Sequence, residues 1–344
     1  MSDVPRTPVR PVRRRLWPIR TPSPQTVLTG LALSGLLAGG AQAQRSINVG
    51  LQAGGTMSWV TFAIERYGLD QQLGFKLNAT TYASKDATRV ALRSGASQIV
   101  VDDFLEVTLL RQKGFPVSAV YPFSLLTGGV VVPQDSPIRT VADLRGKTLG
   151  ATSLTDKTLL ILRAYAKATA GFDVQEASKV VSVSSPLMEQ FMNRGEIEAG
   201  IPFWHHNARM VSGGKFRQLI SSGDLLRGLG LPKNVPLLYI VARTDTDPAT
   251  LGLFLKAVLL AEEKMKSDAA FWPAMLDANL YALPDRAQLP ALRSQWAAGL
   301  PAHWTAADLN ATLLLTRKMI AVAGPDVVGL TRLDTRAFNT SYQP

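Results

Sequence analysis

The sequence predicts an α/β protein with largely parallel sheets, divided between two globular lobes. Short apolar runs typical of buried strands alternate with stretches whose apolar residues recur at helical spacing. The chain has 344 residues, 46% of them apolar, which is enough for two cores. It contains no internal repeat and no low-complexity segment. Such alternation is typical of strands joined by helices in parallel sheets.

The first 43 residues are predicted to be a secretory signal peptide. The opening 20 residues carry six arginines against one aspartate, and no charge follows between 21 and 44. An apolar run of about 15 residues then ends at an A-Q-A site, so cleavage is expected near Ala43. The run is shorter than the roughly 20 residues of a membrane-spanning helix, which argues against the alternative of an anchor. Both the general and the twin-arginine export routes remain open.

Removal of this segment leaves a mildly basic chain. The formal charge of the whole sequence is +11, and +6 remains after the leader is cut. No dense stripe of lysine and arginine interleaved with aromatic residues is present, so nucleic acid is not an expected partner. The absence of cysteine excludes disulfides and thiolate metal sites. An exported, cysteine-free chain indicates a bacterial periplasm.

The expected strands are short runs rich in valine, isoleucine and leucine. The first follows the leader, and each later one comes after a helical stretch or a turn. They cover 47–51, 75–79, 98–101, 117–120, 128–132, a run that ends near Ala151, 180–183, 199–203 and 237–241.

Helices are expected where a capping residue precedes an apolar face. After the first strand, Val60, Ala63, Ile64 and Tyr67 fall on one face of a helix that Gly68 can end. Later helix starts are marked by a short polar side chain, in two places followed by proline. These starts are Ser84, Asp103, Ser153, Ser185-Pro186, Asp247-Pro248 and Thr305.

Three ordered motifs resemble a known family. The stretch at 137–151 is similar to the S-P-I-K-S-x-x-D-L-K-G-K segment of type II periplasmic solute-binding proteins. The stretches at 91–95 and 191–199 resemble the A-L-x-x-G-x-x-D and L-x-x-G-E-I-D-A segments of the branch that binds aliphatic sulfonates, nitrate, taurine and thiamine pyrimidines. Their order and spacing agree with that branch, and the resemblance covers most of 46–300.

The resemblance implies a two-lobed type II fold with a ligand cleft between the lobes and delivery of the ligand to an ABC-type permease. Lobe one would comprise 44–125 with 236–344, and lobe two 126–235. Two departures fall at expected cleft positions. Val101-Asp102-Asp103-Phe104 stands where the family often has G-D-x-P, and Phe203-Trp204-His205-His206 where it often has W-E-P. The ligand is therefore expected to differ from those of the best-known members.

Candidate ligand contacts lie at strand ends and helix starts, where ligands of open α/β sheets bind. Glycine lets the backbone approach closely, free N–H groups at a helix start suit a carboxylate or sulfonate, and aromatic side chains supply apolar walls. The polar candidates are Gly54, Gly55, Thr56, Ser58, Tyr82, Ser84, Asp102, Asp103, Thr152, Ser153 and Thr155, and the candidate walls are Trp59, Phe123 and Trp204.

Several candidates have plainer alternatives. Asp103 and Glu106 have the spacing of a capping box, and capping is compatible with ligand contact. Ser153 also has a capping position, and an isolated tryptophan often belongs to the core. Arg89, Arg139 and Arg209 could pair with an anion or lie on solvated faces.

His205 and His206 raise the question of a metal or catalytic site. A zinc site needs three or four ligands, and the chain has only one other histidine, His303. No G-x-S-x-G or H-E-x-x-H pattern is present. A polar contact from His205 to a ligand is therefore the functional hypothesis, and a surface or structural role is the alternative.

The sequence thus predicts a monomeric, non-enzymatic periplasmic protein that binds a small molecule without a cofactor or metal. A sulfonate- or carboxylate-like anion is favoured, and a membrane permease is the expected partner. The alternatives are an exported enzyme or sensor on the same fold, or a binder of an amine or pyrimidine.

Overall fold

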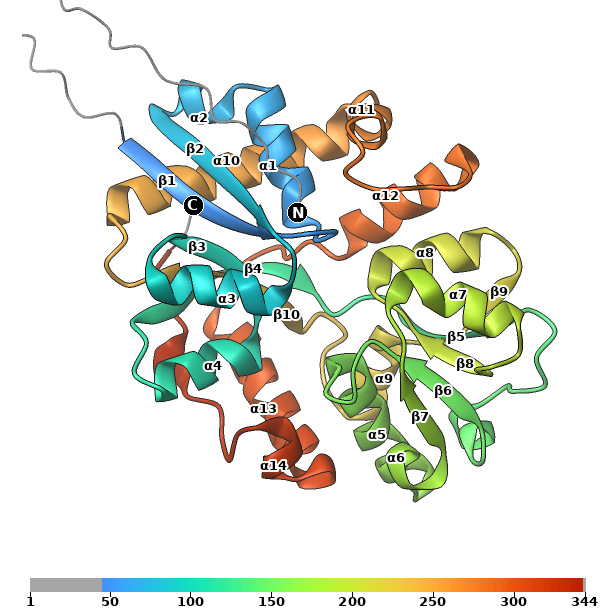
Figure 1. Ribbon diagram of the computed structural model, residues 1–344. Coiled ribbons are helices and arrows are strands. Elements are labelled where there is room, and N and C mark those ends of the chain that lie inside the picture. Colours follow the sequence, from blue (N-terminus) through green and yellow to red (C-terminus); the bar gives the residue numbers. More distant parts are fainter. Residues whose placement is uncertain (1–44, 343–344) are drawn as a thin grey trace, which may run out of the picture. The chain divides into compact units, whose positions relative to one another are not determined.

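The computed structural model describes residues 45–342, and the expected signal peptide lies outside them. These residues form an α/β fold with two five-stranded sheets (Figure 1). The predicted class is therefore confirmed, including its division into two lobes. No helix within 45–342 is long and apolar enough to cross a membrane.

The first sheet has the strand order β2-β1-β3-β10-β4. Strands β1, β2 and β3 run parallel, and β10 is antiparallel to both of its neighbours. The strands are β1 Arg45–Gln52, β2 Phe75–Tyr82, β3 Ile99–Asp103, β4 Val117–Leu125 and β10 Pro236–Arg243.

The second sheet repeats this arrangement with the order β7-β6-β8-β5-β9. Strands β6, β7 and β8 are parallel, and β5 is antiparallel to β8 and β9. The strands are β5 Gly129–Pro133, β6 Thr148–Ala151, β7 Lys179–Ser182, β8 Ala199–Ile201 and β9 Phe216–Ser221.

Helices join and cover the strands. They are α1 Met57–Arg66, α2 Leu69–Gln72, α3 Lys85–Ser94, α4 Phe104–Gln112, α5 Lys157–Ala170, α6 Val174–Ala177, α7 Ser185–Asn193, α8 Trp204–Ser212, α9 Ser222–Gly228, α10 Pro248–Ser267, α11 Phe271–Asp277, α12 Leu289–Ala298, α13 Ala306–Ala323 and α14 Pro325–Val328. Three 3₁₀ turns are Val141–Leu144, Arg286–Gln288 and Thr335–Ala337.

Most predicted helix caps are confirmed. Side chains of Ser84, Asp103, Asp247 and Thr305 accept backbone N–H groups at the starts of α3, α4, α10 and α13. The cap of α7 is one residue earlier than expected, at Ser184. The expected strand at 199–203 ends at Ile201, and Trp204 already begins α8.

The two sheets are joined by two short crossovers. Residues 126–128 lead from β4 to β5, and residues 229–235 lead from α9 to β10. The amide of Leu126 donates to the carbonyl of Val235 over 2.9 Å, so the crossovers are tied side by side. Gly128 and Gly129 have φ values of 81° and 151°, and a Cβ on Gly129 would lie 2.2 Å from the Ile220 carbonyl oxygen. Only glycine fits this passage between the lobes.

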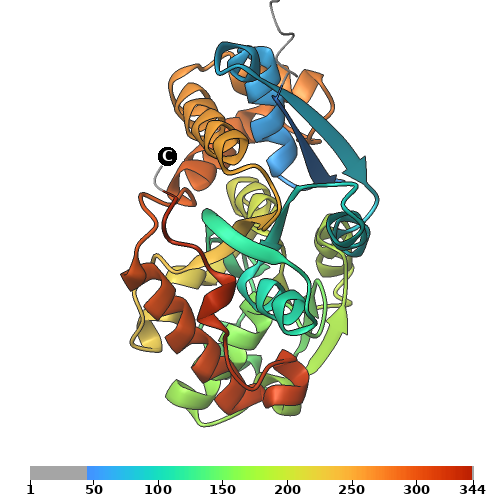
Figure 2. The same ribbon diagram turned by 90° about the vertical axis from the view of Figure 1, so that its left-hand side faces the viewer.

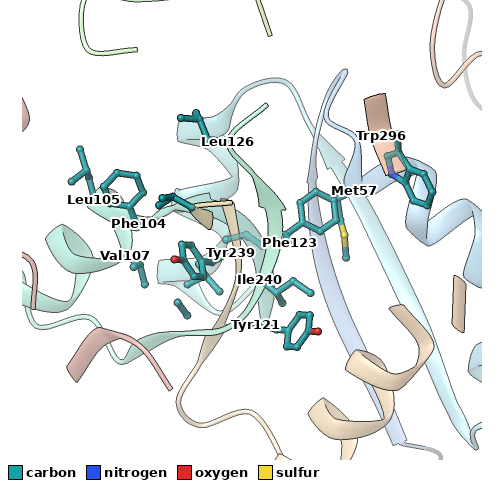
Figure 3. Packing of buried hydrophobic residues seen from close by; sticks show 14 of the residues in the cluster. Met57, Phe104, Leu105, Val107, Tyr121, Phe123, Leu126, Tyr239, Ile240 and Trp296 are labelled. Atoms are coloured by element: carbon teal, nitrogen blue, oxygen red, sulfur yellow. The ribbon is translucent and has the colours of Figure 1, made fainter. Parts of the chain in front are cut away.

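Buried apolar residues form a core around the first sheet (Figure 3). The same cluster extends into the second lobe. A separate cluster lies under α7, where Met188 and Ile197 pack on the second sheet. A Cβ on Gly150 would lie 2.6 Å from Ile197 Cδ1, and one on Gly200 would lie 2.8 Å from Met188 Sδ. Glycines in β6 and β8 therefore let these side chains reach the sheet.

The C-terminal helices contact both lobes. Helix α10 packs on α1, whereas α12 packs on α8 and α13 on α5 (Figure 2). Since α5 and α8 belong to the second lobe, residues after β10 form contacts on both sides of the crossovers. The lobe limits at 125/126 and 235/236 remain a prediction.

Glu262 is the one acidic side chain buried in α10, and it provides a test of this packing. Burial raises its pKa to about 8, because the attraction of Lys266 offsets only part of the loss of water. The folded state therefore holds a proton that the unfolded chain releases above pH 4.5, and stability falls as pH rises toward 8. We expect Glu262→Gln to raise the melting temperature by about 3 °C at pH 8 and much less at pH 5.

The matched control is Glu263→Gln, because Glu263 is exposed and pairs with Lys266. Melting curves of the three proteins across this pH range test the expectation. An equal effect of Glu262→Gln at all pH values would contradict a buried, protonated Glu262.

Candidate ligand-binding site

Aromatic side chains from both lobes meet at the start of α8. The rings of Trp59 in α1 and Trp204 in α8 lie edge to face, with centroids 5.8 Å apart. The ring of Trp59 also packs against those of His205, Trp272 and Tyr281, with centroid distances of 6.1, 6.0 and 5.6 Å. The Tyr281 hydroxyl donates to the His205 carbonyl over 3.2 Å. The structure thus brings together three predicted site residues, Trp59, Trp204 and His205.

Two helix starts converge on this contact. The N-cap residues of α1 and α8, Thr56 and Phe203, provide no side-chain cap. A cavity of about 10 Å³ lies between them, with room for about one water molecule. It is lined by Thr56, Phe123, Ser124, Thr127, Trp204, Gln295, Trp296, Gly299 and Leu300. Figure 3 shows Phe123 and Trp296 among the buried apolar side chains. The strand-end candidates Thr56, Phe123 and Trp204 therefore share one small cavity between lobes.

The other candidates after β1 shape the turn that precedes α1. Gly54 is exposed with a φ of 72°, and the Gly55 amide donates to the Gln52 carbonyl over 2.9 Å. The Ser58 hydroxyl donates to the Gly55 carbonyl over 2.7 Å. In this conformation the Ser58 hydroxyl donates its hydrogen bond within the turn and not to a ligand.

Asp102 and Asp103, at the end of β3, are buried in a network of ion pairs. Lys85 Nζ lies 2.8 Å from both carboxylates, and Arg89 Nε lies 2.8 Å from Asp102 Oδ2. Lys157 Nζ, at the start of α5 in the second lobe, lies 3.3 Å from Asp103 Oδ2. The network therefore crosses from one lobe to the other.

Asp103 both caps α4 and belongs to this network. Its Oδ1 accepts the amides of Leu105 and Glu106, which confirms the capping role predicted for it. Burial opposes its ionisation, but Lys85 and Lys157 outweigh that effect and hold the pKa of the carboxyl well below its usual range. Asp103 is therefore a fixed negative charge that already has three cationic partners, Lys85, Lys157 and, at 3.9 Å, Arg89.

The candidates after β6 mainly contact one another. Thr152 Oγ1 donates to Asp156, and the hydroxyls of Ser153 and Thr155 lie 3.3 Å apart. The cap of α5 is Asp156, which accepts the amides of residues 158 and 159. The alternative that Ser153 caps this helix is therefore wrong. Burial raises the pKa of the Asp156 carboxyl.

The candidates after β2 lie apart from the aromatic contact. The Tyr82 hydroxyl accepts a long hydrogen bond from Ser97 Oγ at 3.4 Å. Ser84 is exposed and caps α3 through the amide of Ala87. A ligand role for either remains a prediction.

The histidine pair is buried within α8. Only 5% of His205 and 8% of His206 is exposed, and the Nδ1 atom of each lacks a hydrogen-bond partner. Burial and, to a smaller extent, the nearby cation Arg209 lower the pKa of both imidazoles, to about 4 for His206. Both rings are thus neutral near pH 7. Arg209 itself pairs with Glu189 of α7 over 2.9 Å.

Some residues of this region carry no signal in the sequence. Tyr281 lies between α11 and α12 in a stretch without helical or strand period, and Lys157 is one of many lysines at a helix start. The sequence indicated Arg209 as a possible partner for an anion, but not as the cation that lies near the two histidines. Only the glycine pair at 128–129 marks the nearby crossover, since such a pair is typical of a bend.

Comparison with known proteins agrees with this geometry. The NMT1/THI5-like family matches residues 70–268, more than half of the chain. The periplasmic aliphatic sulphonate-binding protein SsuA from Escherichia coli superposes over 85% of this chain and 96% of its own, at 18% identity and a TM-score of 0.67. No curated protein matches the sequence.

Two further solved structures share the fold. The alkanesulfonate-binding protein SsuA from Xanthomonas axonopodis pv. citri, bound to MOPS, covers 86% of this chain and 98% of its own, at 15% identity and a TM-score of 0.63. A ligand-binding component of an ABC-type import system from Staphylococcus aureus, with zinc bound, covers 86% and 96% at 13% identity and a TM-score of 0.62. The chain therefore belongs to the NMT1/THI5-like family and has the two-lobed fold of type II periplasmic solute-binding proteins.

Proposed function

We propose that this protein is the periplasmic solute-binding component of an ABC importer, and that it captures a small organic anion between its lobes. The observation that carries the proposal is the convergence of two helix starts without side-chain caps, one from each lobe, on a single cavity. Family membership and the fold support the same role. The mature chain would begin after Ala43, act as a monomer and deliver its ligand to a membrane permease.

An anionic head group suits these helix starts. The first amides of an α-helix lack intrahelical partners, and the helix dipole places partial positive charge there. In α1 the amides of Ser58 and Trp59 already donate to the carbonyls of Gly55 and Thr56, whereas no hydrogen bond within 45–342 engages the amides of residues 204–206 in α8. A sulfonate or carboxylate offers acceptors to several such donors at once.

The walls of the site favour a ligand with an apolar body. Phe123, Trp204 and Trp296 line the cavity, and the ring of Trp59 packs edge to face against Trp204. Aromatic and apolar walls with a few polar groups are typical of small-molecule sites. With the side chains in these positions the cavity is too small for an organic ligand, so binding requires them to part.

The ion-pair network disfavours an amine ligand. Asp102 and Asp103 belong to a network that reaches across the lobe boundary, and each already has cationic partners. An ammonium group would have to displace Lys85 or Lys157 and bury the displaced charge without a partner, which is costly. The network instead supports closure, because Lys157 reaches Asp103 across the boundary.

Opening and closing would occur at the crossovers. The segments 126–128 and 229–235 are short and adjacent, and Gly128 and Gly129 hold backbone conformations that few other residues adopt. Hinges of this kind absorb rotation in a few residues between rigid lobes.

A thermal-shift screen of the mature protein tests the proposal. We expect an alkanesulfonate or carboxylate with an apolar body to raise the melting temperature, because a ligand that binds only the folded state stabilises it by mass action. A matched uncharged analogue, such as the corresponding sulfonamide or amide, should give little shift. Stabilisation by the uncharged analogue alone, or turnover of the ligand, would contradict the proposal.

A variant at Phe203 separates the anion site from the rest of the cleft. Phe203 is the N-cap of α8 and is 46% exposed. In Phe203→Asp the new carboxylate would occupy the helix start, stabilise the unliganded protein slightly and weaken anion binding by about tenfold or more. Phe203→Asn is the control, because it caps the helix without a charge and should weaken binding less. Calorimetric titration with the best anion measures both, and equal affinities would place the anion elsewhere.

Lys157 offers a separate test of closure. Its side chain is 21% exposed, and its ammonium pairs with buried Asp103 across the lobes. We expect Lys157→Met to weaken ligand binding by about threefold to tenfold. The effect should be larger at low salt, because salt screens the attraction between the two charges. Lys167→Met is the control on an exposed turn of the same helix. Titrations at low and high salt would count against the account if both variants behave alike.

A further inference from the structure

The two histidines lie where the lobes touch. Their rings are 4.6 Å apart on α8, and both contact Tyr281, at 5.4 Å and 5.8 Å. The ring of His205 also contacts Trp59 of α1. Trp59 and Tyr281 belong to the segments assigned to lobe one, whereas α8 belongs to lobe two. The contact between lobes therefore covers the imidazoles.

This contact leaves polar atoms without partners. Within residues 45–342, six buried side-chain atoms lack a hydrogen bond, and four of them lie on α8 or on the turn that leads into α12. These four are His205 Nδ1, His206 Nδ1, Arg209 Nε and Gln288 Oε1. A Cβ on Gly213, at the end of α8, would lie 2.9 Å from Gln288 Nε2, so Gln288 packs on the same helix. Burial of unpaired polar atoms costs free energy, so these atoms make the contact between the lobes less stable.

Few charged groups lie near the two histidines, and the one that acts on both rings is the cation Arg209. On α8 itself the neighbour is Arg209, and α7 contributes Glu189, which already pairs with Arg209. The segment before α12 contributes Tyr281, whose pKa burial raises to about 12, so it stays neutral. On the other packed elements, α1 presents Trp59, and Arg293 of α12 donates to the Lys266 carbonyl instead. No carboxylate is left to stabilise an imidazolium there.

We propose that His205 and His206 form a proton-operated gate on lobe closure, so that acidification parts the lobes. The gate rests on the proposed binding function and adds a means of regulating it. In the closed form each ring must stay neutral, because a proton would place a second cation beside Arg209 in a buried contact. In the open form the rings meet water and take up protons in the usual range.

The size of the effect follows from linkage. For His206 alone, the change from an ordinary pKa near 6.5 in the open form to about 4 in the closed form shifts closure by about 30-fold at pH 5. At pH 7.5 the same residue shifts closure hardly at all. His205 adds to the effect in the same direction.

The distance between two spin labels tests the gate without a ligand. The chain has no cysteine, so Lys76→Cys on β2 and Lys179→Cys on β7 place one label on an exposed edge strand of each lobe. We expect a short distance at about pH 7.5 and a population at longer distance at about pH 5, growing at least tenfold relative to the closed one. In a background with His205→Gln and His206→Gln the distance should no longer depend on pH.

The matched control is His303→Gln, because His303 is exposed and pairs with Asp308 away from the lobe contact. This variant should open with pH as the parent does. Distances that are the same at both pH values, or a double variant that opens like the parent, would overturn the proposal. Loss of the far-ultraviolet circular dichroism at pH 5 would also overturn it, since the proton would then unfold the lobes. None of these results affects the thermal shift by an anion at pH 7.5, so failure of the gate is distinguishable from failure of the binding function.

Discussion

The contact of the first turn of α8 with Trp59 and Tyr281 is the constraint on which the rest of the site depends. It aligns the start of α8 with the start of α1, because Trp204 and Thr56 line the same cavity. It also covers two neutral imidazoles and leaves their Nδ1 atoms unpaired. One contact therefore positions the donors for an anion and carries the cost that makes closure reversible.

The rest of the fold holds this contact in place from both sides of the boundary. Tight packing of Met188 and Ile197 over glycines fixes the second sheet beneath α7 and α8. On the other flank, Lys157 reaches Asp103 across the lobes, and α13 packs on α5. The crossovers are tied to each other by Leu126 and Val235, so rotation of the lobes about them would change both the aromatic contact and the ion pair.

Local patterns in the sequence predicted the parts of the fold that depend on local physics. Caps at Asp103, Asp247 and Thr305 were evident because a short acceptor side chain precedes an apolar helical face. The start of α8 was missed because tryptophan and histidine are weak helix formers, and tertiary packing decides the conformation there. Ser153 was misjudged because Asp156, three residues later, offers a stronger acceptor to the same helix.

The site itself was only partly predictable. Expected strand ends indicated Thr56, Phe123 and Trp204, although β4 runs on to Leu125 and Phe123 lies within it. The residues that contact this site, such as Tyr281 and Lys157, come from distant segments of the sequence. They approach the site only because of how the two lobes meet. The spacing of residues along the sequence does not show how closely these segments approach one another.

The central claim is that an anion binds at the converging starts of α1 and α8. A crystal structure of the mature protein with the anion that most raises its melting temperature tests it most directly. The account predicts sulfonate or carboxylate oxygens within about 3 Å of the amides of residues 204–206, with the apolar body against Trp59. An anion seated instead in the groove between α11 and α12, beside Arg286 and Arg293, with those amides uncontacted, would contradict it.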